Sequence, residues 1–306
     1  MTFSSLAEFH ARVEVATADG ARLPVYEVGG PARAPALLVG HANGLAAGSY
    51  EPWLRELARR VRVFAYDARG HGGATWPEGP LETVFAVDRF AEDLAAVAAT
   101  LAARIDGTPL HFAGHSLAAA AAIGLALTGG ANPFASLTLF EPPIFPPPDA
   151  PNYPEAIAQQ TRLVRGSARR QARWSSPEAM REYLGARGVF RSFRPDFLAA
   201  HCRATLRPEG DGFVLCCPPE VESTIFTGHR DADTWEHLPT IRTPLHLVSG
   251  DPDQPDRDWV SGNMAALAAR IPGADLAVIR GAGHMMIPQQ PETCRDLVLR
   301  RMLGAG

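Results

Sequence analysis

The chain has 306 residues, of which 46% are hydrophobic and 20% are charged, so it can bury the core of one large domain without disulfides. All 29 basic residues are arginine and the net charge is −4, which gives no field favouring nucleic acid as a partner. The most apolar run begins at Leu117 and ends in a glycine pair. It is too short to cross a bilayer, so we expect no transmembrane segment.

The four cysteines, Cys202, Cys216, Cys217 and Cys294, match neither a zinc site nor a thioredoxin-like pair. Adjacent cysteines cannot form an unstrained disulfide. The first twenty residues contain acidic residues and no apolar run, which predicts that there is no signal peptide. Together these features predict a cytoplasmic protein with buried, reduced thiols.

Short apolar runs alternate with helical patterns in the first half of the chain, as is typical of a parallel sheet with crossover helices. An antiparallel pair is expected first, over residues 12–16 and 23–28, with a turn at Asp19-Gly20. The strands expected next span residues 36–39, 61–66, 110–113 and 136–140, and the helices 50–60, 87–105 and 117–127.

The alternation stops at a proline-dense segment that begins at Pro142 and cannot form a central strand or a helix interior. We therefore expect an α/β core of residues 1–141 and 239–306, interrupted by a mainly helical lid over residues 142–238. Inside the lid we expect helices over 155–174, 177–187 and 195–206 and a strand over 212–216. In the rest of the core we expect strands over 245–249 and 276–279 and helices over 258–269 and 292–303.

A serine stands between an apolar strand and an alanine-rich helix, in Gly114-His115-Ser116-Leu117-Ala118. A serine hydroxyl becomes a nucleophile when its oxygen is exposed, paired with a base and close to donors for an oxyanion. A sharp strand-to-helix turn supplies the exposure and needs small residues on both sides, which Gly114 and Ala118 provide. Ser116 is therefore the predicted nucleophile.

A histidine must act as the base, and His284 follows the last predicted strand within the small-residue turn Gly281-Ala282-Gly283. Catalytic groups gather at the carboxyl ends of parallel strands, where Ser116 also emerges. The side chain of His115 should point away from the site, His246 is expected in the core, and His41 is expected to shape its loop.

In this order of parts the sequence resembles the α/β-hydrolase family, whose nucleophile, acid and histidine follow one another along the chain. The resemblance implies a mostly parallel eight-stranded sheet with helices on both faces and a lid after strand 6. Residues 39–44 resemble the family's His-Gly loop, although Ala42 replaces a glycine, as Ala118 also does. The resemblance implies oxyanion donors at the backbone N–H groups of Asn43 and Leu117. The turn over residues 66–72 resembles a structural turn of the family, so His71 is not counted as catalytic.

The family commonly places its acid three positions after a glycine that follows the preceding strand, and in Ser249-Gly250-Asp251-Pro252-Asp253 this position is Asp253. Asp251 would then cap its own turn. Glu141, at the end of the sixth strand, is the other candidate, because some members of the family place the acid there. The sequence has no HExxH motif and no complete phosphate loop, so we expect no metal and no cofactor.

The predicted function is that of a serine hydrolase that cleaves a carboxylic ester or a related acyl or lactone bond through an acyl-enzyme. Hydrolysis of a carbon–carbon bond, acyl transfer and cofactor-free perhydrolysis use the same triad and stay open. A catalytically silent ligand-binding protein is the alternative from another class. Epoxide and haloalkane hydrolases are disfavoured, because they carry aspartate where this chain has Ser116.

The lid should enclose a pocket for a small-molecule substrate with an apolar acyl portion. Arginines outnumber acids between residues 162 and 207, which is explained either by an anionic substrate or by solvated helix faces. The candidate lining residues are Phe145, Tyr153, Trp174, Phe190, Phe193 and Phe226.

Overall fold

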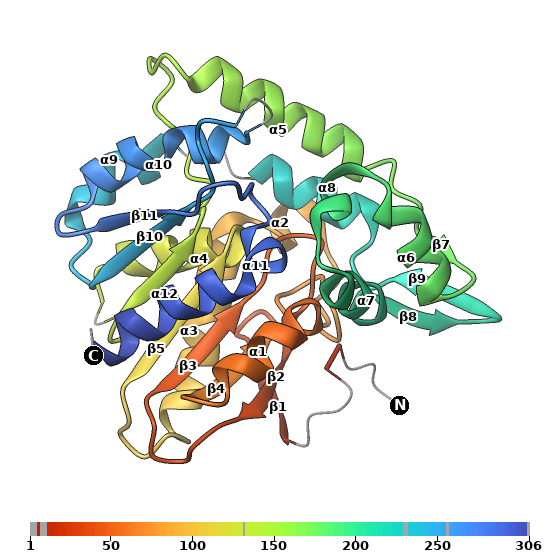
Figure 1. The fold of residues 1–306 in the computed structure, drawn as a ribbon, viewed down its shortest axis with the longest axis horizontal. Helices are drawn as coiled ribbons and strands as arrows, with labels where there is room; N and C mark the ends of the chain where they lie inside the picture. The colour runs from red at the N-terminus through yellow and green to blue at the C-terminus, as the bar shows by residue number, and fades with distance from the viewer. Residues whose placement is uncertain (1–4, 7–10, 131, 229–231, 255–256, 305–306) are drawn as a thin grey trace.

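An eight-stranded sheet with the strand order β1-β2-β4-β3-β5-β6-β10-β11 forms the centre of the molecule (Figure 1). The computed structural model describes residues 5–6, 11–130, 132–228, 232–254 and 257–304. Residues 1–4 and 7–10, part of the segment in which no signal peptide is expected, lie outside the described residues. Among the strands of this sheet, β2 pairs antiparallel with β1 and β4, and the other pairs are parallel. The predicted mostly parallel eight-stranded α/β fold is confirmed. Its strands are β1 (Ala11–Ala16), β2 (Arg22–Gly29), β3 (Ala36–Gly40), β4 (Arg62–Tyr66), β5 (Leu110–His115), β6 (Leu137–Phe140), β10 (Leu245–Ser249) and β11 (Asp275–Val278).

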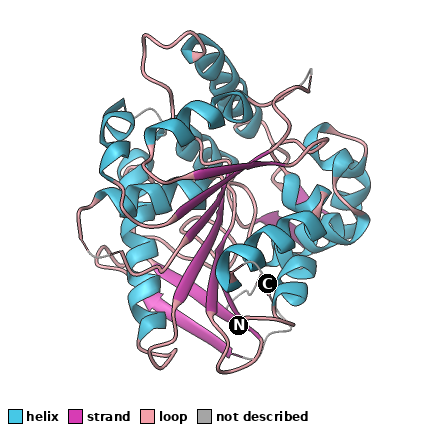
Figure 2. Ribbon diagram, turned by 60° about the vertical axis from the view of Figure 1, so that its left-hand side comes forward, coloured by secondary structure: helices cyan, strands magenta, loops and turns pink. Residues whose placement is uncertain are grey.

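Helices cover both faces of this sheet (Figure 2). In β3, Leu38 packs into the hydrophobic cluster under α3, α4 and α10, whereas Leu37 and Val39 pack into the cluster under α1 and α12. Burial on both faces explains why the central strands are continuous apolar runs and do not alternate with polar residues. The core helices are η1 (Ala47–Tyr50), α1 (Glu51–Leu57), α2 (Leu81–Val84), α3 (Val87–Ala102), α4 (Leu117–Leu127), α10 (Trp259–Arg270), α11 (Met286–Gln289) and α12 (Pro291–Leu303).

The segment between β6 and β10 contains helices and a separate small sheet with the order β7-β9-β8. Its helix α5 runs along the upper edge of the molecule in Figure 1, and its small sheet lies at the right with α6 and α7. The expected helix over residues 155–174 ends earlier, at Ser167, and the chain then enters β7. The segment consists of α5 (Tyr153–Ser167), β7 (Arg173–Trp174), α6 (Pro177–Gly185), η2 (Gly188–Ser192), α7 (Pro195–Ala204), β8 (Leu206–Glu209), β9 (Gly212–Leu215), α8 (Pro219–Gly228), α9 (Ala232–His237) and η3 (Leu238–Thr240).

A buried ion pair holds the turn after β4. Arg69 donates two hydrogen bonds to Asp93 of α3, at 2.7 and 2.6 Å, and both side chains are at most 2% exposed. Arg69 also donates to Asp19 at 2.8 Å. This network ties the turn over residues 66–72 to the sheet edge and to α3, in agreement with the structural role expected for that turn.

Replacing Arg69 with methionine would leave the carboxylate of Asp93 buried without its partner. We expect the free energy of unfolding to fall by about 3 kcal/mol, measured by urea denaturation followed by circular dichroism. Arg22→Met removes an ion pair with Glu14 in which both side chains are exposed, and it should cost less than about 1 kcal/mol. Equal losses in the two variants would show that the buried pair does not stabilise the turn.

Candidate active site

Ser116 occupies a sharp turn between β5 and α4, where its φ is +51° and its ψ is −110°. A non-glycine residue with positive φ is strained and persists only where the surrounding structure holds it. Here the Ser116 N–H donates to the carbonyl of Phe140 at 2.9 Å, and its carbonyl accepts from the N–H of Ala120 at 2.9 Å. The turn places Ser116 in the wall of a cavity, as the strand-turn-helix pattern predicts.

Small residues allow the backbones around Ser116 to approach closely. A Cβ atom at Gly114 would lie 2.9 Å from the backbone nitrogen of Ala119, and one at Gly40 would lie 2.5 Å from the Cβ of Ala118. Ala118 is inside α4 and its φ is not positive. The position therefore requires a small residue but not glycine, which explains why alanine is accepted there.

His284 and Glu141 form a close pair at the same edge of the sheet. His284 follows β11 and Glu141 follows β6, and the Nδ1 of the histidine lies 2.6 Å from the Oε2 of the carboxylate. The side chain of Glu141 is fully buried. Its Oε1 accepts from the N–H of Gly250 and from the hydroxyl of Ser261, each at 2.6 Å. These two donors hold the Glu141 carboxylate in one orientation, and the carboxylate in turn holds the orientation of the His284 ring.

Asp253 does not take the position predicted for it. Its side chain is 77% exposed and pairs with Arg280 at 2.5 Å. Asp251 accepts the N–H of Asp253 at 3.1 Å, as expected for a residue that caps its own turn. This turn directs Asp253 towards solvent, so the prediction that it is the partner of His284 is wrong. Glu141, the alternative at the end of β6, occupies that position.

The surroundings of His284 set its pKa. Burial disfavours the imidazolium, but the hydrogen bond with Glu141 and the charges of Asp258 and Glu141 outweigh it and raise the pKa of His284. Burial also disfavours the charged form of Glu141, yet its hydrogen bonds with His284 and Ser261 lower its pKa. The pair therefore stabilises a proton on the imidazole ring.

No hydrogen bond joins His284 to Ser116 within the described residues, although both line one cavity.

A buried histidine, His115, supports the backbone of His284. His115 donates from Nε2 to the carbonyl of His284 at 2.9 Å and accepts at Nδ1 from the hydroxyl of Tyr50 at 2.6 Å. The same hydroxyl accepts from the N–H of Ala42 at 3.4 Å. Burial holds the pKa of His115 well below its ordinary value, so the ring is neutral. His115 thus connects the loop after β3 with the loop that carries His284, a role that the sequence did not indicate.

Two residues with free backbone N–H groups line the cavity in the described part of the chain, Asn43 in the loop after β3 and Leu117 at the start of α4. The N–H of Leu117 opens α4 and has no partner within the helix, and that of Asn43 donates to no backbone carbonyl among the described residues. The Asn43 amide donates to the carbonyl of Glu222 at 3.0 Å. His71 anchors the loop by accepting the N–H of Gly44 at 3.0 Å.

His41 accepts the N–H of Ala68 at 3.0 Å and donates to the carbonyl of Ala42 at 2.9 Å. It therefore shapes its loop, as expected. His246 was expected in the core, but it is partly exposed and pairs with Asp275 at 2.6 Å.

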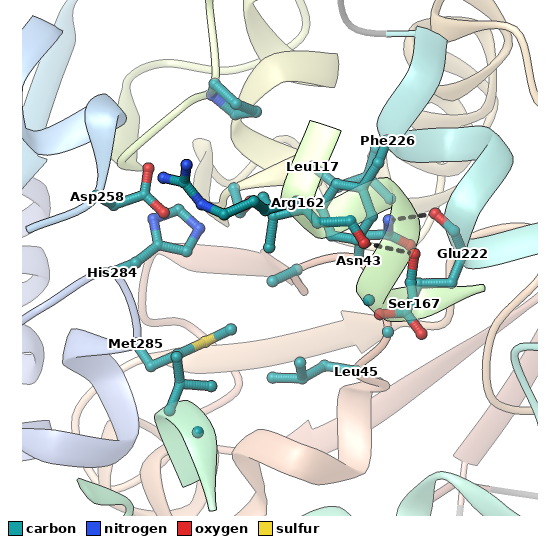
Figure 3. A pocket seen from close by; sticks show the side chains of 18 of the residues that line it. Asn43, Leu45, Leu117, Arg162, Ser167, Glu222, Phe226, Asp258, His284 and Met285 are labelled. Atoms are coloured by element: carbon teal, nitrogen blue, oxygen red, sulfur yellow. Dashed lines mark hydrogen bonds between the residues drawn. The ribbon is translucent and has the colours of Figure 1, made fainter. Parts of the chain in front are cut away.

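A cavity of about 510 Å³ lies between the sheet edge and the inserted segment, with His284, Asn43 and Leu117 in its wall (Figure 3). Phe145, Phe190 and Phe226 line it, as considered from the sequence. Three other aromatic candidates pack against neighbouring rings and do not line it: Tyr153, Trp174 and Phe193. Residues outside the inserted segment also line the cavity, and no sequence pattern indicated them: Leu45, Trp259, Val260 and Met285.

The described residues contain no group of three or more His, Cys, Asp or Glu side chains arranged to hold a metal ion. Nor does any helix in the described part of the chain have the length and apolar character needed to span a membrane. All four cysteines are free and buried, and burial raises the pKa of Cys202 to about 12.

The model of the alpha/beta hydrolase family matches residues 36–297 of this chain. A search of curated proteins finds no match. Among solved structures, the chain is similar to a hydrolase from Pseudomonas aeruginosa, with 25% identity, a TM-score of 0.67, and 96% of this chain and 98% of the other covered.

Two further solved structures share the fold at lower identity. An E-2-(acetamidomethylene)succinate hydrolase has 21% identity and a TM-score of 0.76, with 96% of this chain and 100% of the other covered. An esterase from Thermogutta terrifontis has 24% identity and a TM-score of 0.65, with 96% and 99% covered.

Proposed function

Because the chain belongs to the alpha/beta hydrolase family, we propose that it is a serine hydrolase that cleaves a carboxylic ester or a related acyl bond through an acyl-enzyme on Ser116. One observation carries the proposal. His284 bonds to the buried Glu141 at 2.6 Å and shares a cavity with Ser116, which the strained turn holds in the cavity wall. A nucleophile, a base and a group that orients the base are the parts of a catalytic triad.

The reaction begins when the Ser116 oxygen attacks the carbonyl carbon and the Nε2 of His284 takes the hydroxyl proton. Glu141 stabilises the imidazolium that forms. The negative charge on the carbonyl oxygen is held by the N–H groups of Asn43 and Leu117. The tetrahedral intermediate then collapses, the ester C–O bond breaks, and the alcohol leaves with the proton from His284.

Hydrolysis of the acyl-enzyme repeats these steps with water as the nucleophile. His284 takes a proton from the water while the water oxygen attacks the acyl carbon, and Ser116 recovers the proton when the acid is released. All of these steps use side chains and backbone groups of the chain itself.

We propose that residues 142–238 act as the lid over this site, because Phe145, Phe190 and Phe226 of that segment line the cavity. The proposed location is the cytoplasm, where the buried cysteines stay reduced.

A fluorophosphonate probe and a substrate panel test this proposal. We expect the wild-type protein to hydrolyse a short p-nitrophenyl ester and to react with the probe at one site, which peptide mass spectrometry should identify as Ser116. A panel of esters, lactones and vinylogous diketones, with and without an alcohol acceptor, separates ester hydrolysis from carbon–carbon cleavage and acyl transfer. Absence of probe reaction together with tight binding of a small ligand would favour a silent binding protein instead.

A further inference from the structure

Helix α5 and the turn after it present two arginines to the cavity. Arg162 and Arg170 line it together with Leu163 and Ser167, which recur at the spacing of one helix face. Arg162 and Arg165 are both exposed, but Arg165 does not line the cavity. One face of α5 thus brings Arg162 to the cavity that Ser116 and His284 also line.

The arginines that line the cavity differ in their contacts. Arg170 forms an ion pair with Glu222, whose side chain is 8% exposed. Arg187 lies 4.0 Å over the ring of Tyr183 and donates to the carbonyl of the same residue at 2.8 Å. Arg162 makes no hydrogen bond and no ion pair with any residue that the structure describes. It is therefore the cavity-lining arginine whose guanidinium remains open to a ligand.

Arg162 stands where the inner cavity meets an outer, wider depression of about 1220 Å³, and it lines both together with His284 and Asp258. In Figure 3 its guanidinium points towards the end of the cavity where His284 and Asp258 lie. Asp258 uses its carboxylate to cap α10, accepting the N–H of Val260 at 3.0 Å. No ion pair joins Asp258 to Arg162 within the described residues.

We propose that Arg162 binds a carboxylate carried by the substrate, so that the preferred substrates are half-esters, in which one carboxyl of a dicarboxylic acid is esterified and the other is free. A guanidinium presents a planar fork of N–H donors that matches a carboxylate, and such charge-assisted pairs are roughly twice as strong as neutral hydrogen bonds. The apolar side chains of the wall, Leu45, Phe145 and Phe226 among them, would contact the methylenes between the two carboxyl groups.

The inference rests on the proposed function and adds the substrate class to it. Ser116 attacks the esterified carboxyl, the alcohol leaves with the proton from His284, and water releases the dicarboxylate. The free carboxylate stays bound to Arg162 throughout and takes no part in bond breaking. It contributes equally to binding of the substrate and of the transition state, so its loss should act mainly on KM and only where the substrate carries the charge.

Paired substrates test the inference. The monoethyl esters of succinic, glutaric, adipic and suberic acid are compared with the corresponding ester amides, in which the free carboxylate is replaced by a carboxamide of the same shape. For the best chain length we expect the wild-type kcat/KM of the half-ester to exceed that of its ester amide by about 30-fold, as one charge-assisted hydrogen-bonded pair predicts. A ratio near one at every chain length would overturn the proposal.

Variants then assign the preference to one residue. Arg162→Met should remove the 30-fold preference by raising KM for the half-ester, and should change kcat/KM for the ester amide less than about threefold. Arg162→Lys should restore part of the preference, because lysine keeps the charge but not the fork. Arg165→Met, the matched control on the same helix, should keep it fully. A loss in Arg162→Met that is equal for both substrates would assign Arg162 a structural role instead.

A binding measurement separates this inference from the proposed function. Adipate should slow the labelling of Ser116 by a neutral fluorophosphonate in the wild-type protein, and Arg162→Met should abolish this protection without changing the labelling rate itself. Labelling without protection would contradict the carboxylate site and leave the serine hydrolase standing. Absence of labelling in the wild-type protein would instead contradict the proposed function.

Discussion

Replacing Ser116 with alanine should lower kcat for a p-nitrophenyl ester by at least about 10⁴-fold, as loss of the nucleophile does in serine hydrolases. The fold should survive, because alanine meets the same positive φ as serine and the backbone hydrogen bonds with Phe140 and Ala120 do not involve the side chain. The measurement is steady-state turnover together with fluorophosphonate labelling, with the melting temperature recorded for each variant.

Ser167→Ala is the matched control, since Ser167 lines the same cavity but donates its hydroxyl to the carbonyl of Leu163 at 2.8 Å. It should keep both turnover and labelling. If Ser116→Ala were still labelled at the wild-type rate, another residue would be the nucleophile. If Ser167→Ala lost activity as fully as Ser116→Ala, the assignment would fail as well.

The surroundings of Ser116 could be predicted because they are local in sequence. The apolar run before it and the alanines after it specify β5 and α4, and α4 spans the residues expected for it, Leu117–Leu127. Gly114 and Ala118 reveal the close approach of strand and helix, since a Cβ at Gly114 would collide with the backbone of Ala119 and the Cβ of Ala118 already leaves no room for one at Gly40. The position of His284 could also be predicted from local sequence, because it follows the last strand directly.

The partner of His284 could not be chosen from local sequence. Strands β6 and β10 are neighbours in the sheet and both end at the edge where β11 ends, so Glu141 and Asp253 were both available. The two acids differ in their tertiary contacts. Gly250 and Ser261, more than 100 residues away in sequence, donate hydrogen bonds to Glu141, whereas Asp253 pairs with Arg280 at the surface. The one signal in favour of Glu141 was its place at the end of the sixth strand, where some members of the family carry the acid.

The inserted segment was predicted least well, because its short strands depend on each other. Strand β7 has two residues and exists only through its pairing with β9, in which Trp174 lies opposite Phe213. The helix predicted over residues 155–174 was therefore too long, because it included β7, which follows the end of α5 at Ser167. Pairings of this kind leave no periodicity in the sequence. The role of His115 was missed for a similar reason, since its partners come from two distant loops.

Glu141→Gln should lower kcat/KM by about 10³- to 10⁴-fold, because the amide cannot stabilise the imidazolium of His284. Asp253→Asn should change kcat/KM by less than about twofold, since Asp253 is 77% exposed and faces Arg280. These two variants carry the same chemical change at the two candidate acids. Their comparison at one pH, with a p-nitrophenyl ester, tests which carboxylate serves His284. A large loss in Asp253→Asn with little effect in Glu141→Gln would reverse the assignment.

The pH profile adds a readout that a misfolded variant would not imitate. Activity requires neutral His284, so kcat/KM should fall as the pH drops through the pKa of that imidazole. Because Glu141 raises the pKa of His284, the acid limb of the wild-type protein should lie above the ordinary histidine value of about 6.5. Glu141→Gln removes the negative charge, so its residual activity should persist to lower pH than that of the wild type. Asp253→Asn should leave the limb in place, and an unmoved limb in Glu141→Gln would mean that Glu141 does not set the charge state of His284.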